Sequence, residues 1–340
     1  MKNESSRKKA GWICGILCAG LILFAGVGWM LTEIQRREVA GQKEKIQEET
    51  ERLKAQYEKL AETRNALEEQ KKKMTEARQK ENRAESANGK MIVEVGEPLE
   101  LTDLEAKLQE MIADRTATGE KWEVYVKKLS DGSFAKTGEE PLKAASLIKL
   151  YIMGAVCEQY DQLAAQYGTA QIDTLLSAMI TVSDNDAANE LTSMLGAGDE
   201  VEGREQVNRY CRQKGYTGST MGRMLLADSS NGENYTTAAD CAVFLFDVYQ
   251  GRHPHADQML ELLKQQQRTE KIPAGVPEGV ETANKTGELA DVENDAAIIW
   301  TDDQPYIVCV MADQLTDTQA AREKIVELSS EIYHQIQGGN

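Results

Sequence analysis

Three short groups of residues have the types and the order that serine-based acyl transfer requires. They are Ser146-Leu147-Ile148-Lys149, Ser183-Asp184-Asn185 and Lys285-Thr286-Gly287. A serine hydroxyl is a poor nucleophile at neutral pH, so it needs an adjacent base, donors for the developing oxyanion and groups that hold the substrate. The three motifs contain side chains for each of these tasks, which predicts one active site assembled from distant parts of the chain.

The first motif opens an apolar run over residues 144–160 that predicts a helix. Ser146 would then lie near the N-terminal end, where free backbone N–H groups favour negative charge and the amide of Ser146 can serve as an oxyanion donor. Lys149 would lie on the same face and could accept the hydroxyl proton if burial or the cationic Lys285 lowered its pKa. An ordinary surface helix would give the same tetrapeptide, so this motif alone decides little.

The other two motifs also have plain structural explanations. Residues 183–185 separate two helical stretches, where Asp and Asn commonly cap helices. Residues 285–287 precede a pair of strands near the C-terminus, where a glycine either lets a ligand approach a strand edge or simply makes a turn. The prediction of a site therefore depends on all three motifs occurring in one chain.

The region that carries the motifs, residues 95–337, is predicted to be one α+β domain. The patterns indicate a helix over 101–117, a hairpin over 122–137, a second hairpin over 296–311 and a final helix over 317–336. The segments between the hairpins are mainly helical. Strands at both ends and a helical middle predict an antiparallel sheet flanked by helices, with an all-helical subdomain inserted.

Two segments precede this domain. Residues 11–31 carry no charge and are long enough to cross a bilayer as a helix, and residues 1–10 contain four basic side chains. This predicts a single-pass cell-membrane anchor with a cytoplasmic N-terminus and the catalytic domain outside. Residues 33–85 are charged, with an apolar residue at every seventh position, which predicts a helical or coiled-coil stalk of roughly 80 Å. A coiled-coil core uses two apolar positions in each heptad, and here the second of them is mostly polar. A weak homodimer and a single spacer helix therefore both remain open.

The composition argues against several other functions. The formal net charge of −17 is the wrong sign for contacts with nucleic-acid phosphates. Neither the cysteines nor the three histidines have metal-ligand spacing, so no metal or cofactor is predicted. His253-Pro254-His255 is expected to form a surface turn. Buried free thiols are expected for Cys157, Cys211, Cys241 and Cys309.

The motifs and their surroundings resemble the class A β-lactamases and the wider penicillin-binding serine hydrolases over residues 101–336. Leu175–Leu191, around the second motif, and Asn284–Trp300, around the third, extend the resemblance. It implies the same α+β fold, with the site in a cleft beside the all-helical subdomain. The implied roles are acylated nucleophile for Ser146, base for Lys149, proton shuttle for Ser183, substrate clamp for Asn185, carboxylate anchors for Lys285 and Thr286, and oxyanion donor for the backbone amide of Glu288 after Gly287.

One departure from the family pattern concerns hydrolysis of the acyl-enzyme. Class A β-lactamases carry a Glu shortly after an Arg on a loop, and that Glu activates the deacylating water. In this chain the Arg resembles Arg223, and Leu225 stands where the Glu would be. An aliphatic side chain accepts no proton, so the resemblance implies slow deacylation unless Glu233 or Asp228 substitutes.

Two further departures concern the substrate. The carboxylate of Glu288 would repel a penicillin carboxylate unless it turns away from the site. Ser183 follows Ser146 by only 37 residues, a shorter interval than in the β-lactamases. The helical subdomain is therefore expected to be smaller and the site open to bulkier ligands.

Three hypotheses for the function remain open. The first is an anchored serine hydrolase that opens β-lactams, at least slowly. The second is a peptidase or acyltransferase that acts on the D-Ala-D-Ala-type stem peptides of peptidoglycan and that β-lactams trap. The third is a non-catalytic wall-binding module, against which the presence of all three motifs argues. The fate of the acyl-enzyme, which either persists or turns over, separates the first two.

Overall fold

The computed structural model describes residues 101–301 and 304–338. The predicted membrane span, stalk and cytoplasmic N-terminus lie outside these residues. Within the described part of the chain, no helix combines the length and the apolar character needed to cross a membrane.

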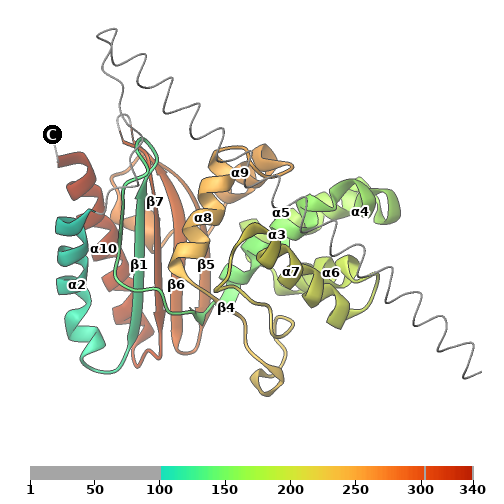
Figure 1. Ribbon diagram of the computed structural model, residues 1–340, viewed down its shortest axis with the longest axis horizontal. Helices are drawn as coiled ribbons and strands as arrows, with labels where there is room; N and C mark the ends of the chain where they lie inside the picture. Colours follow the sequence, from blue (N-terminus) through green and yellow to red (C-terminus); the bar gives the residue numbers. More distant parts are fainter. Residues whose placement is uncertain (1–100, 302–303, 339–340) are drawn as a thin grey trace, which may run out of the picture. The chain divides into compact units, whose positions relative to one another are not determined.

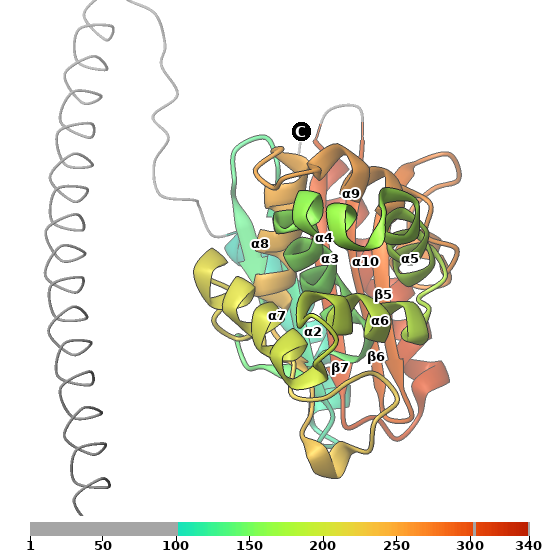
Figure 2. The same cartoon turned by 90° about the vertical axis from the view of Figure 1, so that its right-hand side faces the viewer.

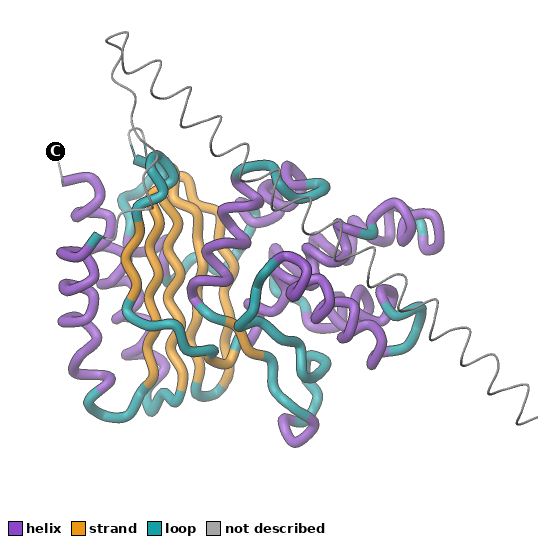
Figure 3. Tube along the Cα trace, in the orientation of Figure 1, coloured by secondary structure: helices purple, strands orange, loops and turns teal. Residues whose placement is uncertain are grey.

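A five-stranded antiparallel sheet forms the centre of the fold, with the strand order β2-β1-β7-β6-β5. The strands at its first edge come from the start of the domain and the rest from its end, as the sequence predicted (Figure 1, Figure 3). The bounds are β1 Lys121–Lys128, β2 Phe134–Lys136, β5 Glu281–Leu289, β6 Val292–Trp300 and β7 Tyr306–Asp313.

Helices cover both faces of the sheet. Figure 1 shows α2 (Thr102–Thr116) and α10 (Thr318–Gly338) on one face, and α8 (Ala238–Tyr249) with α9 (Ala256–Lys264) on the other. Strand β7 is buried along its whole length because Val308 and Val310 pack toward the first pair while Ile307 and Cys309 pack toward the second. A strand covered on both faces therefore has a continuous apolar sequence.

An all-helical block lies in front of the sheet in the view of Figure 2. It consists of α3 Ile148–Glu158, α4 Tyr160–Tyr167, α5 Thr169–Thr181, α6 Asn185–Leu195 and α7 Glu200–Lys214. Helix α3 is buried on every side from Ile148 to Cys157, which explains why its sequence is apolar without a polar face. The predicted α+β architecture with a helical subdomain is confirmed.

One local prediction needs correction. Ser146 lies in a 3₁₀ turn, η1 (Ala145–Leu147), and not inside a continuous helix over 144–160. The chain enters this turn from a short strand, β3 (Leu142–Lys143), which pairs with β4 (Tyr235–Thr236), so the regular helix begins only at Ile148. The third motif lies within a strand of its own, β5, and precedes β6 and β7, the strand pair that the sequence predicted.

His253 is also placed differently from the prediction. It is buried, and its ring nitrogens lie 3.3 Å from the hydroxyl of Tyr210 and 3.4 Å from that of Tyr216. The side chain of His253 is therefore a hydrogen-bonded part of the core, while Pro254 and His255 lie in the exposed turn that the sequence predicted. The four cysteines from Cys157 onward are buried and free, as expected.

The crossing of α6 and α7 gives a test of the helical block. A methyl group at Gly203 would lie 1.9 Å from the backbone oxygen of Thr192. We expect Gly203→Ala to lower the free energy of unfolding by about 1–3 kcal/mol, although alanine is the better helix former. Urea unfolding measures this change. The exposed Gln213 on the same helix provides the control, and Gln213→Ala should change stability by less than about 0.5 kcal/mol; equal stability of both variants would contradict the packing argument.

Candidate active site

The turn that carries Ser146 is held in a strained conformation by the sheet. Ala145 has a φ of +47°, which a non-glycine residue rarely adopts. The buried amide of Asn294, on β6, donates to the backbone oxygens of Lys143 at 2.9 Å and Ala144 at 3.2 Å. Asn294 thereby fixes the chain immediately before the serine.

Strand β5 approaches the same turn closely. A side chain at Gly287 would place its first carbon 2.8 Å from the oxygen of Ala144 and 3.1 Å from the backbone nitrogen of Ser146. Only glycine fits this approach without moving either segment. The backbone of the third motif therefore lies beside the amide of Ser146, which is the arrangement that two oxyanion donors need.

Lys149 connects the first motif to the second. Its amine nitrogen lies 2.6 Å from the backbone oxygen of Ser183 and 2.7 Å from Oδ1 of Asn185, two atoms that can only accept. It also lies 3.1 Å from the hydroxyl oxygens of Ser146 and Ser183. A neutral amine has two N–H groups for the two acceptors and a lone pair left for a hydroxyl proton, so the geometry suits a general base.

The environment of Lys149 favours the neutral amine. Burial, with a smaller effect from the charge of Arg268, lowers its pKa to about 7, against a weaker opposing effect of Asp184. Among the described residues no carboxylate bonds to the amine. The prediction that the pKa of Lys149 is depressed is thus supported, but the cationic neighbour is Arg268 where Lys285 was expected.

Ser183 lies between the two lysines. Its φ is +62°, and its hydroxyl is 3.1 Å from the amine of Lys149 and 2.8 Å from that of Lys285. Asp184 fixes the following helix by accepting from the backbone N–H of Ala187 at 2.7 Å. The second motif therefore caps α6 and also contributes side chains to the cluster. Helix capping and participation in the candidate site are compatible interpretations of its sequence.

Lys285 is buried and its hydrogen bonds stay within the protein. Its amine donates to the hydroxyl of Ser183 and to the backbone oxygen of Thr286, both at 2.8 Å. Burial lowers its pKa well below the usual value, the neighbouring Lys149 lowers it further, and the buried Asp295 opposes them. The three motifs thus meet at one hydrogen-bonded cluster, formed by Ser146, Lys149, Ser183, Asn185 and Lys285.

Glu288 follows this cluster, and its charge is neutralised. Its carboxylate lies 2.9 Å from Arg268, 3.2 Å from the buried Lys271 and 3.9 Å from Arg322. Burial raises its pKa, but these cations outweigh that effect and hold the pKa below its usual value. The expected repulsion of a substrate carboxylate is therefore offset, while the backbone of Glu288 remains next to Gly287.

The loop after Arg223 has Leu225 at the position where the family resemblance places a Glu. Asn189 donates to the backbone oxygen of Leu225 at 2.9 Å and accepts from its N–H at 2.8 Å. Asn189 lies one turn beyond Asn185 on α6, so the same helix face holds both Lys149 and the loop. Leu225 is thereby fixed on the side of α6 that carries the site.

Neither candidate substitute for the missing Glu joins the cluster. Glu233 is bound by the guanidinium of Arg223 at 3.0 Å, and this pair closes the loop. Asp228 is exposed and accepts from the backbone N–H of Ser230 at 2.8 Å. In the described part of the chain neither carboxylate has a hydrogen bond to Ser146, Lys149 or Ser183.

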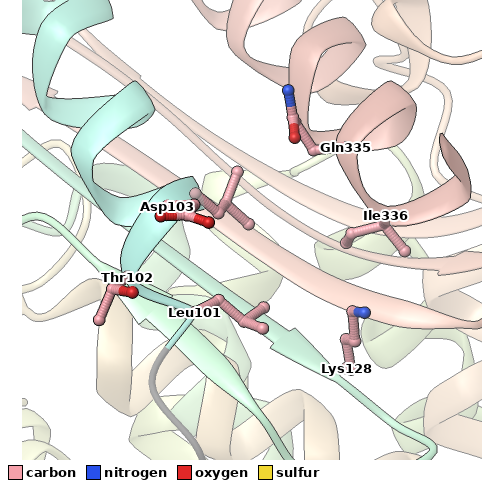
Figure 4. A pocket seen from close by; sticks show the side chains of 7 residues that line it. Leu101, Thr102, Asp103, Lys128, Gln335 and Ile336 are labelled. Carbon is pink, nitrogen blue, oxygen red and sulfur yellow. The ribbon is translucent and has the colours of Figure 1, made fainter. Parts of the chain in front are cut away.

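Other parts of the domain show no competing chemical site. Within residues 101–301 and 304–338, no three His, Cys, Asp or Glu side chains are grouped so that they could hold a metal ion. A cavity of about 290 Å³ lies between the start of α2, the end of β1 and the end of α10 (Figure 4). Its lining includes Asp103, Lys128 and Gln335 but none of the predicted site residues.

Sequence reasoning missed three residues that shape this site. Asn294, Asn189 and Arg268 each reach it through contacts between segments far apart in the chain. The spacing of Asn185 and Asn189 on one helix was a usable signal. Asn294 and Arg268 stand in polar sequence that gives no such signal.

The fold and the clustered motifs define a β-lactamase-like domain. The family model described as the "Beta-lactamase enzyme family" matches residues 103–166 and 163–336. The chain therefore belongs to the β-lactamase enzyme family. A search of curated proteins finds no match to this chain.

Solved structures share the fold. PBP-A is 22% identical with a TM-score of 0.62, covering 71% of this chain and 98% of its own. A β-lactamase from Sphaerobacter thermophilus is 23% identical with a TM-score of 0.59, covering 69% and 98%. A leucine-to-glutamate variant of PBP-A, solved as an acyl-enzyme complex with penicillin G, is 22% identical with a TM-score of 0.61, covering 70% and 98%.

The pKa of Lys149 predicts a pH profile. We expect the rate at which Ser146 reacts with a fluorophosphonate probe to rise with pH and to be half-maximal near pH 7, because only the neutral amine accepts the hydroxyl proton. Lys149→Arg, which keeps a proton at every pH, should lower the rate by about 10²- to 10⁴-fold. Labelling followed by mass spectrometry measures both. Lys324→Arg on α10 should leave the profile unchanged; a profile that is flat around neutral pH would contradict the assignment of the base.

Proposed function

We propose that this chain is a serine hydrolase of the class A β-lactamase type, which opens β-lactam amide bonds through an acyl-enzyme at Ser146 and hydrolyses that intermediate slowly. One observation carries the proposal: the amine of Lys149 lies 3.1 Å from the Ser146 hydroxyl with its other hydrogen bonds directed to two pure acceptors. A neutral lysine in this position keeps its lone pair for a hydroxyl proton, and the hydroxyls of Ser146 and Ser183 both lie 3.1 Å from it.

The acylation step follows from the contacts. Lys149 accepts the hydroxyl proton as the oxygen of Ser146 bonds to the amide carbon, and the negative charge moves to the carbonyl oxygen. The backbone amides of Ser146 and Glu288 donate to that oxygen. The carbon–nitrogen bond then breaks, and the nitrogen takes a proton through Ser183, whose hydroxyl is within hydrogen-bond distance of both lysines. Asn185 and Thr286 hold the substrate.

Hydrolysis of the acyl-enzyme is expected to be slow. It requires a water molecule and a base on the side of the loop, where Leu225 is held by Asn189. General base catalysis typically contributes about 10²- to 10⁴-fold, so its absence lengthens the life of the intermediate by a similar factor. The leucine-to-glutamate variant of PBP-A was solved as an acyl-enzyme complex with penicillin G, which supports the expectation that a protein with this fold can be trapped in this state.

The second candidate is a peptidase or acyltransferase that acts on the stem peptides of peptidoglycan. Leu225 favours this candidate. An enzyme of peptidoglycan synthesis can transfer its acyl group to an amine, so it does not need a base at position 225 that activates water to hydrolyse a β-lactam acyl-enzyme. We further propose that the N-terminal span and stalk hold the domain of residues 95–337 outside the cell membrane. Stem peptides of peptidoglycan occur there. Turnover of an acyl-D-alanyl-D-alanine peptide in the absence of β-lactam hydrolysis would select this candidate.

Mass spectrometry of the intact protein tests the nucleophile. We expect penicillin G to add its full mass to the wild-type chain, because ring opening loses no atoms, and the adduct should persist while the free drug is removed. Ser146→Ala should show no adduct. Ser193→Ala, on α6 and without a side-chain hydrogen bond among the described residues, should be acylated like the wild type. An adduct on Ser146→Ala, or none on the wild type, would contradict the proposal.

A substitution in the loop tests the cause of slow deacylation. We expect Leu225→Glu to accelerate the loss of the adduct by about 10²-fold or more, since it adds a base at the position that Asn189 fixes. Leu225→Gln, which has the same size without the base, should not. Leu226→Glu places the same group on the neighbouring residue, which is 73% exposed, and provides a second control. Equal rates of adduct loss in the wild type and in all three variants would show that the residue at position 225 does not limit deacylation.

A further inference from the structure

Lys143, three residues before Ser146, is bound at each of its polar groups. Its amine lies 2.6 Å from the carboxylate of Asp291 and 3.1 Å from that of Asp313. Its backbone N–H donates to the other oxygen of Asp313 at 3.2 Å, and its backbone oxygen accepts from the amide of Asn294 at 2.9 Å. The three motifs do not explain why a residue outside them is fixed so completely.

The three partners of Lys143 come from one end of the central sheet. Asp313 is the last residue of β7, Asn294 lies in β6, and Asp291 lies in the turn between β5 and β6. Two of these side chains are buried and are themselves fixed by backbone groups. Asn294 accepts from the N–H of Ala312 at 3.1 Å, and Asp313 accepts from the following N–H at 2.6 Å. The support for Lys143 is therefore part of the sheet and not a loose surface loop.

The amine of Lys143 is in the opposite state from the amine of Lys149. Burial lowers the pKa of Lys143, but the hydrogen bonds and charges of Asp291 and Asp313 outweigh burial and hold the pKa above its usual value. The lysine therefore stays charged near pH 7, where Lys149 titrates. A charged amine between two carboxylates accepts no proton, so Lys143 is suited to anchor the chain and not to act as a second base.

The chain between Lys143 and Ser146 has little freedom. The N–H of Ala144 donates to the backbone oxygen of Asn234 at 2.8 Å, so this residue is held from the side of the loop as well as from the sheet. Ala145 follows with its φ of +47°, and backbone strain of this kind persists only where the surroundings impose it. If Lys143 were released, Ala145 could relax to an ordinary φ, and the backbone N–H and hydroxyl of Ser146 would move with it.

We propose that Lys143 is a positioning residue, whose ion pairs with Asp291 and Asp313 keep the strained turn in its reactive form. In that form the hydroxyl of Ser146 lies 3.1 Å from the amine of Lys149, and the backbone N–H of Ser146 is available to the oxyanion. The inference rests on the proposed function and assigns the far end of the sheet a part in acylation. Lys143 acts through the turn and not on the substrate.

The rate of acylation by penicillin G tests the inference in the full-length chain. Lys143→Met, an apolar side chain of similar length, should lower the maximal acylation rate by about 10- to 100-fold, because a small misplacement of reacting groups costs that much. The concentration of penicillin G that gives half of the maximal rate should not change, since Asn185 and Thr286 are left in place. Lys143→Arg keeps the charge and should retain most of the rate. Mass spectrometry of the adduct over time measures both quantities.

Lys264 on α9 provides the matched control. It is 30% exposed, against 26% for Lys143, and its amine also lies between two carboxylates, 2.6 Å from Glu281 and 3.5 Å from Glu261. Lys264→Met should therefore keep the wild-type rate. Urea unfolding shows that each compared variant is folded at the start of the reaction. Asp291→Asn changes a more exposed partner with less risk to folding, and it should give a rate between those of the wild type and Lys143→Met.

The outcomes separate this inference from the proposed function. A wild-type rate in Lys143→Met, an equal loss in Lys264→Met or in Lys143→Arg, or a change confined to the half-saturating concentration would overturn the inference while the proposed function stands. A fluorophosphonate probe needs Ser146 as a nucleophile but no β-lactam. If this probe labels the wild type at least about 10-fold faster than Lys143→Met and penicillin G labels neither, the inference is supported and the proposed function is contradicted. A wild type that neither reagent labels contradicts both.

Discussion

The burial of the Lys149 amine without a carboxylate partner is the constraint on which the site depends. Moving a charged ammonium out of water is costly, so the protein stabilises the neutral amine and satisfies its two N–H groups with oxygens from the second motif. This fixes the distance between α3 and the start of α6. It also leaves the lone pair for a hydroxyl proton, so the arrangement that relieves the cost of burial is the same one that suits Lys149 to the proposed role of base.

The strained backbone around the site is held by the surrounding fold. Positive φ angles at Ala145 and Ser183 cost roughly 1–3 kcal/mol each, and each occurs where contacts from other segments leave the chain little choice. Asn294 and Gly287 hold the first from the sheet, while the two lysines hold the second. Ser146 and Ser183, the proposed nucleophile and proton shuttle, are thus positioned before a substrate arrives, which would reduce the reorganisation that the proposed catalysis requires.

Local patterns predicted the elements whose burial is regular. Helices α2 and α10 and strand β1 have apolar residues at the expected periods, and β7 is a continuous apolar run. The three motifs together predicted a single cluster. Strand β5 gives no local strand pattern, because its sequence contains Glu, Asn, Lys and Thr and is buried by packing against β6, η1 and α9. The 3₁₀ turn at Ser146 and the buried His253 likewise depend on contacts from distant segments, which no short sequence pattern encodes.

The network separates the groups for acylation from those for deacylation. Among the described residues, the hydrogen bonds within the lysine–serine cluster come from α3, α6, β5 and the turns that precede these helices, and none comes from the loop at Leu225. The loop is attached through Asn189, a different residue of α6. A change at position 225 can therefore alter the life of an acyl-enzyme without disturbing its formation. The groups proposed for acylation and the loop proposed to govern hydrolysis therefore lie on separate parts of one fold, and each can vary while the other is maintained.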